Sequence, residues 1–170
     1  YRTGKVFAYE WSSITPDIMA LAKGLGGGFP IGAVLSTKEA AEGMSSGSHG
    51  STFGGNPLAC SIANEVLKIF EDEKISENIA DKSNKLVSGL EELIKRHKNK
   101  IKDVRGKGLM LGIECYIENS ILTEKSLEAG LLLVNAGENV VRIMPPLNIT
   151  EEDIDEFFLR FNNALESLEN

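Results

Sequence analysis

The stretch from Pro16 to Ala33, PDIMALAKGLGGGFPIGA, places one lysine between an apolar segment and a run of glycines. The apolar residues of Pro16–Ala22 predict a short buried strand that leads into Lys23. The glycines that follow are incompatible with a helix or a regular strand and bring the backbone close to another group. Such a position can remove water from an amine while leaving space beside it, which favours Schiff-base chemistry. A solvated lysine beside a turn is the alternative on local sequence alone.

The glycine run does not match the common phosphate-binding fingerprints. No Gly-Lys-Ser/Thr ends it, and Lys23 precedes the glycines, so it is not a Walker motif. The dinucleotide pattern that begins at Gly24 is broken by Phe29. The loop by itself is therefore weak evidence for a phosphate cradle.

A second loop of small residues, from Ser45 to Asn56, precedes a helix that is expected to open at Pro57. Hydroxyls at Ser51 and Thr52, with free backbone N–H groups before a helix, suit a phosphate. The same residues could equally be turn formers. His49 in this loop is a candidate acid or base, although a hydrogen-bonding loop residue is the more common role of such a histidine.

The remaining pattern predicts further strands and helices. Thr37 is expected to cap a short helix after a strand at Ala33–Ser36, and Thr150 with Asp153 to cap the last helix. A boundary near residue 73 separates a glycine-rich βα region from a compact α+β unit. The other expected elements are helices over 57–72, 75–97 and 124–131, a strand within 104–115, and a hairpin of 131–134 with 140–144.

Arg142 is the one charge inside the apolar run from Val140 to Met144. On a strand buried on one face, this arginine either points to solvent or binds a carboxylate in a bidentate pair. Arg105, between Val104 and Gly106, is expected to be structural.

Bulk composition excludes several classes of protein. The 170 residues are 42% hydrophobic and 25% charged, which is ordinary for a globular protein, and the formal charge of −7 opposes nucleic-acid binding. No apolar run approaches the length needed to span a membrane. Cys60 and Cys115 lack metal-ligand spacing and are expected to be buried, reduced thiols, which favours the cytoplasm.

Taken together, these motifs resemble one family, the class III aminotransferases of the ornithine and 4-aminobutyrate type. The resemblance covers essentially the whole chain and rests on several separate motifs. They are PDI at 16–18, AKGLGGGFPIGA at 22–33, HGSTFGGNP at 49–57, RGKGLMLG at 105–112, VRIMPPL at 141–147 and RTGK at 2–5.

The resemblance implies a fold-type I transferase of the α/β class that uses pyridoxal phosphate (PLP). Residues 1–73 would be the C-terminal part of the large domain, and residues 74–170 the small α+β domain. Lys23 would hold PLP through a Schiff base and move a proton between substrate and cofactor. Thr52, assisted by Ser51, would bind the phosphate in the neighbouring subunit's site of a homodimer. Arg142 would bind the substrate α-carboxylate.

Within the family, the run from Asn135 to Arg142 and the short C-terminal unit are most similar to the acetylornithine type. This implies transfer from N-acetylornithine to 2-oxoglutarate in arginine biosynthesis. Ornithine, succinylornithine and 4-aminobutyrate are alternative donors, and a related aminomutase or decarboxylase, or a binding domain without activity, are alternative functions. The family's large domain extends upstream of Tyr1, so we expect an internal fragment that is inactive alone.

Overall fold

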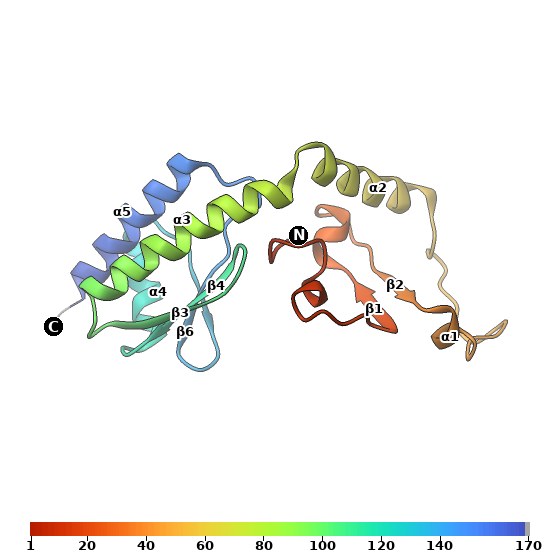
Figure 1. The fold of residues 1–170 in the computed structure, drawn as a ribbon, viewed down its shortest axis with the longest axis horizontal. Coiled ribbons are helices and arrows are strands. Elements are labelled where there is room, and N and C mark those ends of the chain that lie inside the picture. Colours follow the sequence, from red (N-terminus) through yellow and green to blue (C-terminus); the bar gives the residue numbers. More distant parts are fainter. Residues whose placement is uncertain (169–170) are drawn as a thin grey trace. The chain divides into compact units, whose positions relative to one another are not determined.

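The structure, a computed structural model, describes residues 1–168 and divides them into two compact units. One unit spans Tyr9–Lys74, and the other combines residues 75–168 with Tyr1–Ala8. Figure 1 shows the elements of each unit. Within the described residues, no helix is both long enough and apolar enough to cross a lipid bilayer.

The first unit is built on an antiparallel hairpin followed by a helix. Strands β1 and β2 pair from Ile18 opposite Ser36 to Leu21 opposite Ala33, so both predicted strands are present. The expectation that the first of them is buried was wrong, because Ile18 is 62% exposed and no residue of β1 is buried. The Thr37 side chain accepts a hydrogen bond from the Ala40 amide, as its sequence position predicts. The elements are η1 (Ala8–Trp11), β1 (Ile18–Leu21), η2 (Lys23–Gly26), β2 (Ala33–Ser36), α1 (Lys38–Ala41) and α2 (Pro57–Asp72).

The second unit is a four-stranded antiparallel sheet in the order β3-β4-β6-β5. Helices α3 and α5 lie side by side over it, and α4 packs against α5 (Figure 1). The mixed α/β class is therefore confirmed. The elements are α3 (Ile75–Arg96), β3 (Ile101–Lys107), β4 (Met110–Cys115), α4 (Asn119–Glu128), β5 (Val134–Ala136), β6 (Val140–Ile143) and α5 (Glu151–Ser167).

The core of this second unit lies between the sheet and the helices. Leu111 and Ile113 on β4, with Val141 and Ile143 on β6, are buried, while the residues between them lie on the opposite face. The helices contribute a large apolar set at helical spacing, as the sequence predicts. Its fully buried members are Ile79, Leu86, Leu90, Leu93, Leu122, Ile154, Phe161 and Leu165.

The prediction of one strand within 104–115 was wrong, because the chain turns there to make two. Lys107 pairs with Met110, so Gly108 and Leu109 form a two-residue connection. Gly108 has a φ of 55°, which a residue with a side chain rarely adopts. At Gly106 a Cβ would lie 2.1 Å from the Met110 carbonyl oxygen, so this position also requires glycine.

The helix expected at 124–131 begins earlier, at Asn119. No side chain adjacent in the chain caps it. Instead the Asn119 amide donates to Oδ1 of Asn139, at 2.8 Å, and Asn139 also donates to the carbonyls of Cys115 and Ile117. Because the cap comes from a residue 20 positions away, no local sequence signal marks this helix start.

Residues 1–8 group with the second unit, although sequence analysis placed them with the first. Leu109 donates its amide to the Arg2 carbonyl at 3.0 Å, and the Arg2 guanidinium donates to the carbonyls of Leu109 and Pro145. A Cβ on Gly108 would lie 2.4 Å from the Thr3 carbonyl carbon. This close contact explains the grouping. The other change of unit falls between Lys74 and Ile75.

The two cysteines differ in environment. Cys115 is buried, and desolvation raises the pKa of its thiol to about 11, so it is protonated at neutral pH. Cys60 is exposed, which corrects the expectation that both thiols are buried. It lies on α2, whose apolar face is only partly covered.

Candidate functional site

Lys23 is one of three residues other than glycine in the first unit that have a positive φ, the others being Ser13 and Lys74. It follows β1 directly, opens η2, and has a φ of 53°, in the left-handed region that residues with side chains rarely occupy. Strained conformations of this kind concentrate at functional sites. Its amine is exposed and makes no hydrogen bond or ion pair with any of residues 1–168. Residues 1–168 therefore do not remove water from this amine, and of the two environments left open by the sequence the solvated one is observed. The amine is available to a ligand.

The glycines after Lys23 let the loop pack closely against its own unit. A Cβ on the buried Gly26 would lie 2.7 Å from Cγ2 of Ile31. Gly27 has a φ of 56°, and a Cβ there would lie 2.9 Å from Cγ2 of Val66, on α2. A side chain at Gly26 would clash within the loop, and one at Gly27 would push the loop off α2. The glycines therefore support the loop that begins at Lys23.

Ser51 and Thr52 lie in the exposed loop before α2. The loop turns through a hydrogen bond from the Gly54 amide to the Ser51 carbonyl at 3.4 Å. Asn56 ends the loop by accepting from the Ala59 amide at 2.9 Å, which caps α2. Neither hydroxyl is hydrogen-bonded within the described chain, and none of its hydrogen bonds joins either one to Lys23. Both hydroxyls can therefore donate a hydrogen bond to an anionic ligand.

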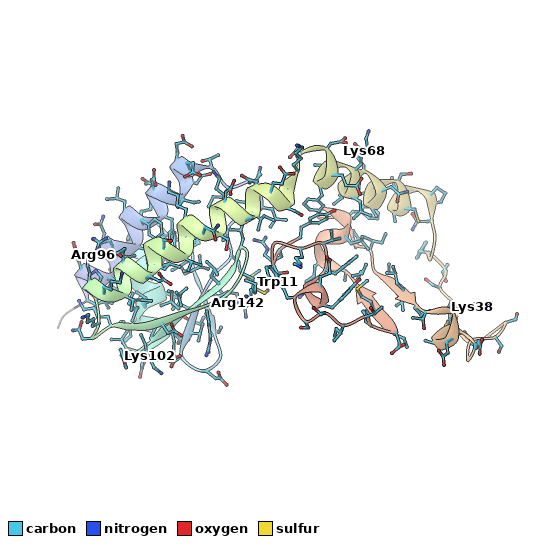
Figure 2. The ribbon with its side chains drawn as sticks, in the orientation of Figure 1. Trp11, Lys38, Lys68, Arg96, Lys102 and Arg142 are labelled. Carbon is cyan, nitrogen blue, oxygen red and sulfur yellow. The ribbon has the colours of Figure 1, made fainter. Side chains whose placement is uncertain are left out.

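Arg142 lies at the centre of β6 in the second unit, and its side chain is labelled in Figure 2. Its backbone pairs with Gly112 on β4 and with Val134 on β5. The neighbours Val141 and Ile143 are buried, so Arg142 projects from the opposite, exposed face. No carboxylate among residues 1–168 pairs with it. Of the two roles left open by the sequence, the solvent-facing one is observed.

The other charged candidates differ in their partners. Arg105 forms ion pairs with Glu114 at 3.8 Å and Glu138 at 3.4 Å, which agrees with its expected structural role. His49 is exposed and has no hydrogen-bonding partner in the described chain. The described residues contain no cluster of three or more metal-ligating side chains.

Sequence reasoning missed Glu114, which lies on β4 diagonal to Arg142, and its partner Lys102 on β3. Lys102 pairs with Glu114 at 2.5 Å, and this contact lowers the pKa of the Glu114 carboxyl. The alternation of β4 could have placed Glu114 on the face of Arg142. The alternation could not predict which residues pair across the strands, because this register depends on the turns at 108–109 and 137–139.

Comparison with known proteins finds one protein family that matches nearly the whole chain. The profile of the class-III aminotransferases matches residues 1–165. The acetylornithine aminotransferase of Brucella melitensis is 46% identical over 167 residues, which cover 98% of this chain and 41% of that protein. The chain therefore spans about two fifths of the length of the curated relatives it matches.

Solved structures agree over nearly the whole chain. An acetylornithine aminotransferase from Elizabethkingia anophelis superposes with a TM-score of 0.89 at 36% identity, covering 98% of this chain and 43% of the other. An ornithine aminotransferase from Toxoplasma gondii, described with partial occupancy of PLP at its active site, gives 0.89 at 33% identity over 96% of this chain and 40% of the other.

Proposed function

Because the chain belongs to the class-III aminotransferase family, we propose that the protein carrying it transfers amino groups with PLP held at Lys23. The observation that carries this proposal is the backbone of Lys23, which is left-handed and presents a free amine between β1 and the glycine loop. The family match includes this residue and the loops around it.

The chemistry of the available donors fits PLP. Lys23 supplies a primary amine for the cofactor's aldehyde, and Ser51 and Thr52 supply two unbonded hydroxyls for its phosphate. When bound, PLP would supply the electron sink that stabilises negative charge at the substrate carbon that bears the transferred amino group. The protein would hold the cofactor, orient the substrate and transfer protons between them.

Each residue has a defined part in the proposal. Lys23 holds the cofactor and, once substrate has replaced it, accepts and returns a proton at its Nζ atom. Thr52, with Ser51, donates to the phosphate, and we propose that Thr52 does so in the neighbouring subunit of a homodimer. Arg142 binds a substrate carboxylate through paired N–H groups. Its guanidinium is exposed and pairs with no carboxylate of residues 1–168, which supports this role.

For the substrate pair we propose N-acetylornithine as amino donor and 2-oxoglutarate as acceptor, in arginine biosynthesis in the cytoplasm. The 46% identity to an acetylornithine aminotransferase supports this choice. Similarity to a solved ornithine aminotransferase favours ornithine as the second candidate donor. The two donors differ by one acetyl group on the α-amine, so the choice depends on contacts with that amine and its acetyl group.

The first test is chemical trapping in the complete natural polypeptide that carries this sequence. After addition of PLP and reduction with borohydride, mass spectrometry of the peptides should find a pyridoxyl group on Lys23. Lys23→Ala should abolish the label, whereas Lys38→Ala, which removes another exposed lysine of the same unit, should leave it in place. Labels scattered over surface lysines would contradict the proposal and favour a binding domain.

The second test separates the candidate reactions. Adding N-acetylornithine alone should convert the PLP absorbance to that of pyridoxamine phosphate, and 2-oxoglutarate should restore it. Ornithine should act more slowly. Product formation without any pyridoxamine phosphate would instead indicate an aminomutase or a decarboxylase.

A further inference from the structure

The pairing of β6 with both of its neighbours ends beside Arg142. Arg142 pairs with Gly112 on β4, and one more pair, Leu111 with Ile143, completes the pairing of these two strands. On the other side, Arg142 is the last residue of β6 that pairs with β5, opposite Val134. Arg142 therefore lies at an end of the sheet, where strands fray unless further contacts hold them.

A proline stops the pairing of β4 and β6 from continuing. Extended by two residues, their register would place Leu109 opposite Pro145. At the far end of β4, Cys115 donates its amide to the Asn139 carbonyl at 3.0 Å, and hydrogen-bonded pairs recur at every second residue from there. Leu109 and Pro145 therefore occupy a position at which the two strands would exchange hydrogen bonds. Pro145 has no N–H, so it cannot donate to the Leu109 carbonyl.

Arg2 supplies the hydrogen bonds that the proline cannot make. Its guanidinium donates to the carbonyl of Leu109, at 3.3 Å, and to the carbonyl of Pro145. Its own carbonyl accepts from the Leu109 amide at 3.0 Å. One residue thus joins the two strand ends at the position of the missing pair. Because the donor is charged, these bonds are stronger than those of a neutral amide.

Close packing holds Arg2 in this position. A Cβ on Gly108, in the turn between β3 and β4, would lie 2.8 Å from the Arg2 carbonyl oxygen and 2.4 Å from the Thr3 carbonyl carbon. The hydroxyl of Ser83, on α3, donates to the Gly108 carbonyl at 2.9 Å. The turn that carries Leu109 is therefore fixed both to α3 and to Arg2.

We propose that Arg2 is a positioning residue for Arg142, which replaces the hydrogen bonds that Pro145 cannot make and so keeps the end of β6 paired. Arg142 lies three residues before Pro145, so the strand end that Arg2 holds includes the backbone from which the Arg142 guanidinium projects. A bidentate contact requires both N–H groups to align with the carboxylate, and a small displacement of the backbone loses that alignment. The inference rests on the carboxylate-binding role proposed for Arg142.

The first test compares kinetics in the complete natural polypeptide loaded with PLP. Arg142→Met should raise the KM of N-acetylornithine, of 2-oxoglutarate or of both at least about tenfold, since it removes the bidentate partner. For the same substrate, Arg2→Ala should raise KM about three- to tenfold, the factor expected when only about a tenth to a third of the molecules stay paired. The kcat should change by less than about twofold, because saturating substrate selects the paired conformation. In R2A/R142M, KM should be no higher than in R142M.

A second substitution tests the missing hydrogen bond directly. P145A returns an N–H to the position opposite Leu109, and a residue before Pro146 stays extended, as a strand requires. R2A/P145A should therefore have a KM about three- to tenfold below that of R2A, the factor that one backbone hydrogen bond contributes. P146A restores an N–H at the next residue, which the alternation of the strand directs away from β4. R2A/P146A should keep the KM of R2A.

Hydrogen exchange gives a readout that needs neither substrate nor turnover. The amide of Ile143 should exchange faster in R2A and return toward the parent rate in R2A/P145A. Lys100→Met is the control for a general loss of stability, because it also removes two hydrogen bonds from a cation to carbonyls of the same unit. Lys100 lies at the far end of β4, where its carbonyl accepts from the Tyr116 amide at 2.9 Å. K100M should leave KM unchanged.

The contrary outcomes separate this inference from the proposed function. An unchanged KM in R2A, a further rise when R2A is added to R142M, no rescue by P145A, equal rescue by P146A, or an equal rise in K100M would overturn the role of Arg2. Each would leave the role of Arg142 intact. An unchanged KM for both substrates in R142M would instead overturn the carboxylate-binding role in the proposed function.

Discussion

The helices α2 and α3 are both amphipathic, yet they bury very different numbers of side chains. Of the 16 residues of α2, in the first unit, two alanines are buried, whereas the 22 residues of α3, in the second, include five buried residues that are all leucine or isoleucine. Large apolar residues of α2 such as Leu58 and Ile69 are 63% and 42% exposed. An apolar helix face therefore predicts a helix, but not that the same chain covers it.

The same contrast holds for the units as wholes. In residues 9–74 only Gly26, Ala59 and Ala63 are buried, and large side chains such as Val34 and Phe53 are 72% and 80% exposed. The second unit has a continuous core between sheet and helices. We therefore expect the second unit to hold its structure by itself, and the first to depend on contacts beyond its own residues.

The largest expected difference in stability is between two phenylalanine substitutions, one in each unit. Phe161→Ala opens a cavity in the core of the second unit and should lower the free energy of unfolding by about 3–5 kcal/mol. Phe53→Ala, in the exposed loop of the first unit, should change it by less than about 0.5 kcal/mol. Urea denaturation followed by far-UV circular dichroism measures both.

Trp11, the only tryptophan, reports on the first unit and sharpens this test (Figure 2). Phe161→Ala should shift the transition seen by circular dichroism and leave the fluorescence transition of Trp11 unchanged. Equal shifts by both probes would show that the units unfold together and would break the comparison.

A smaller effect is expected at Asn139, which joins the β5–β6 hairpin to the start of α4. Its side chain makes three hydrogen bonds, and its backbone has a φ of 58°. Asn139→Ala should cost about 2–4 kcal/mol, and Asn139→Gly less, because glycine tolerates the left-handed backbone. Asn135→Ala, which removes one exposed hydrogen bond to Thr123, should cost less than about 1 kcal/mol.

A cost for Asn139→Gly as large as for Asn139→Ala would assign the whole effect to the side-chain hydrogen bonds. An effect at Asn139 no larger than at Asn135 would show that the hairpin does not support α4.

Lys100 is a buried cation at the end of α5. Its ammonium donates to the carbonyls of Leu165, at 2.9 Å, and Leu168, at 2.8 Å, which satisfies groups left unpaired at a helix C-terminus. Lys100→Met should lower the free energy of unfolding by about 1–2 kcal/mol. Lys98→Met, at an exposed position nearby, should have no measurable effect. Equal melting temperatures for the two variants would contradict this role.

The smallest effect is pH dependence at Glu151. Hydrogen bonds from Lys82 and then Lys85 lower the pKa of this carboxyl in the folded state. Its contribution to stability is therefore fully present above the ordinary pKa near 4.5 and is lost as the pH falls through the lowered, folded-state value. Glu151→Gln should melt below the parent at pH 7, and the difference should shrink as the pH falls below about 4.5. Glu152→Gln, at a neighbouring exposed position, should match the parent at both pH values.

The functional residues show the same limit of sequence reasoning as the fold. Lys23 was identified from its glycine loop and the family motif, and its role as cofactor lysine stays a prediction, as do the roles of Ser51, Thr52 and Arg142. The left-handed backbone of Lys23 had no sequence signal, since lysine is not among the residues that favour that region. The contacts of Glu114 with Lys102 and Arg105 depend on strand register, which local pattern does not determine.

The sequence by itself determined the features that depend on neighbours along the chain. These are the period of the apolar residues in α2, α3 and α5, the caps at Thr37 and Thr150, and the strands β1 and β2. Only the tertiary structure decided the start of α4, the turn between β3 and β4, and the grouping of residues 1–8 with the second unit. Each of these depends on hydrogen bonds or close packing between residues far apart in the chain, such as Asn139 with Asn119 and Arg2 with Leu109. Local propensity does not predict those partners, because they come into contact only when the chain has folded.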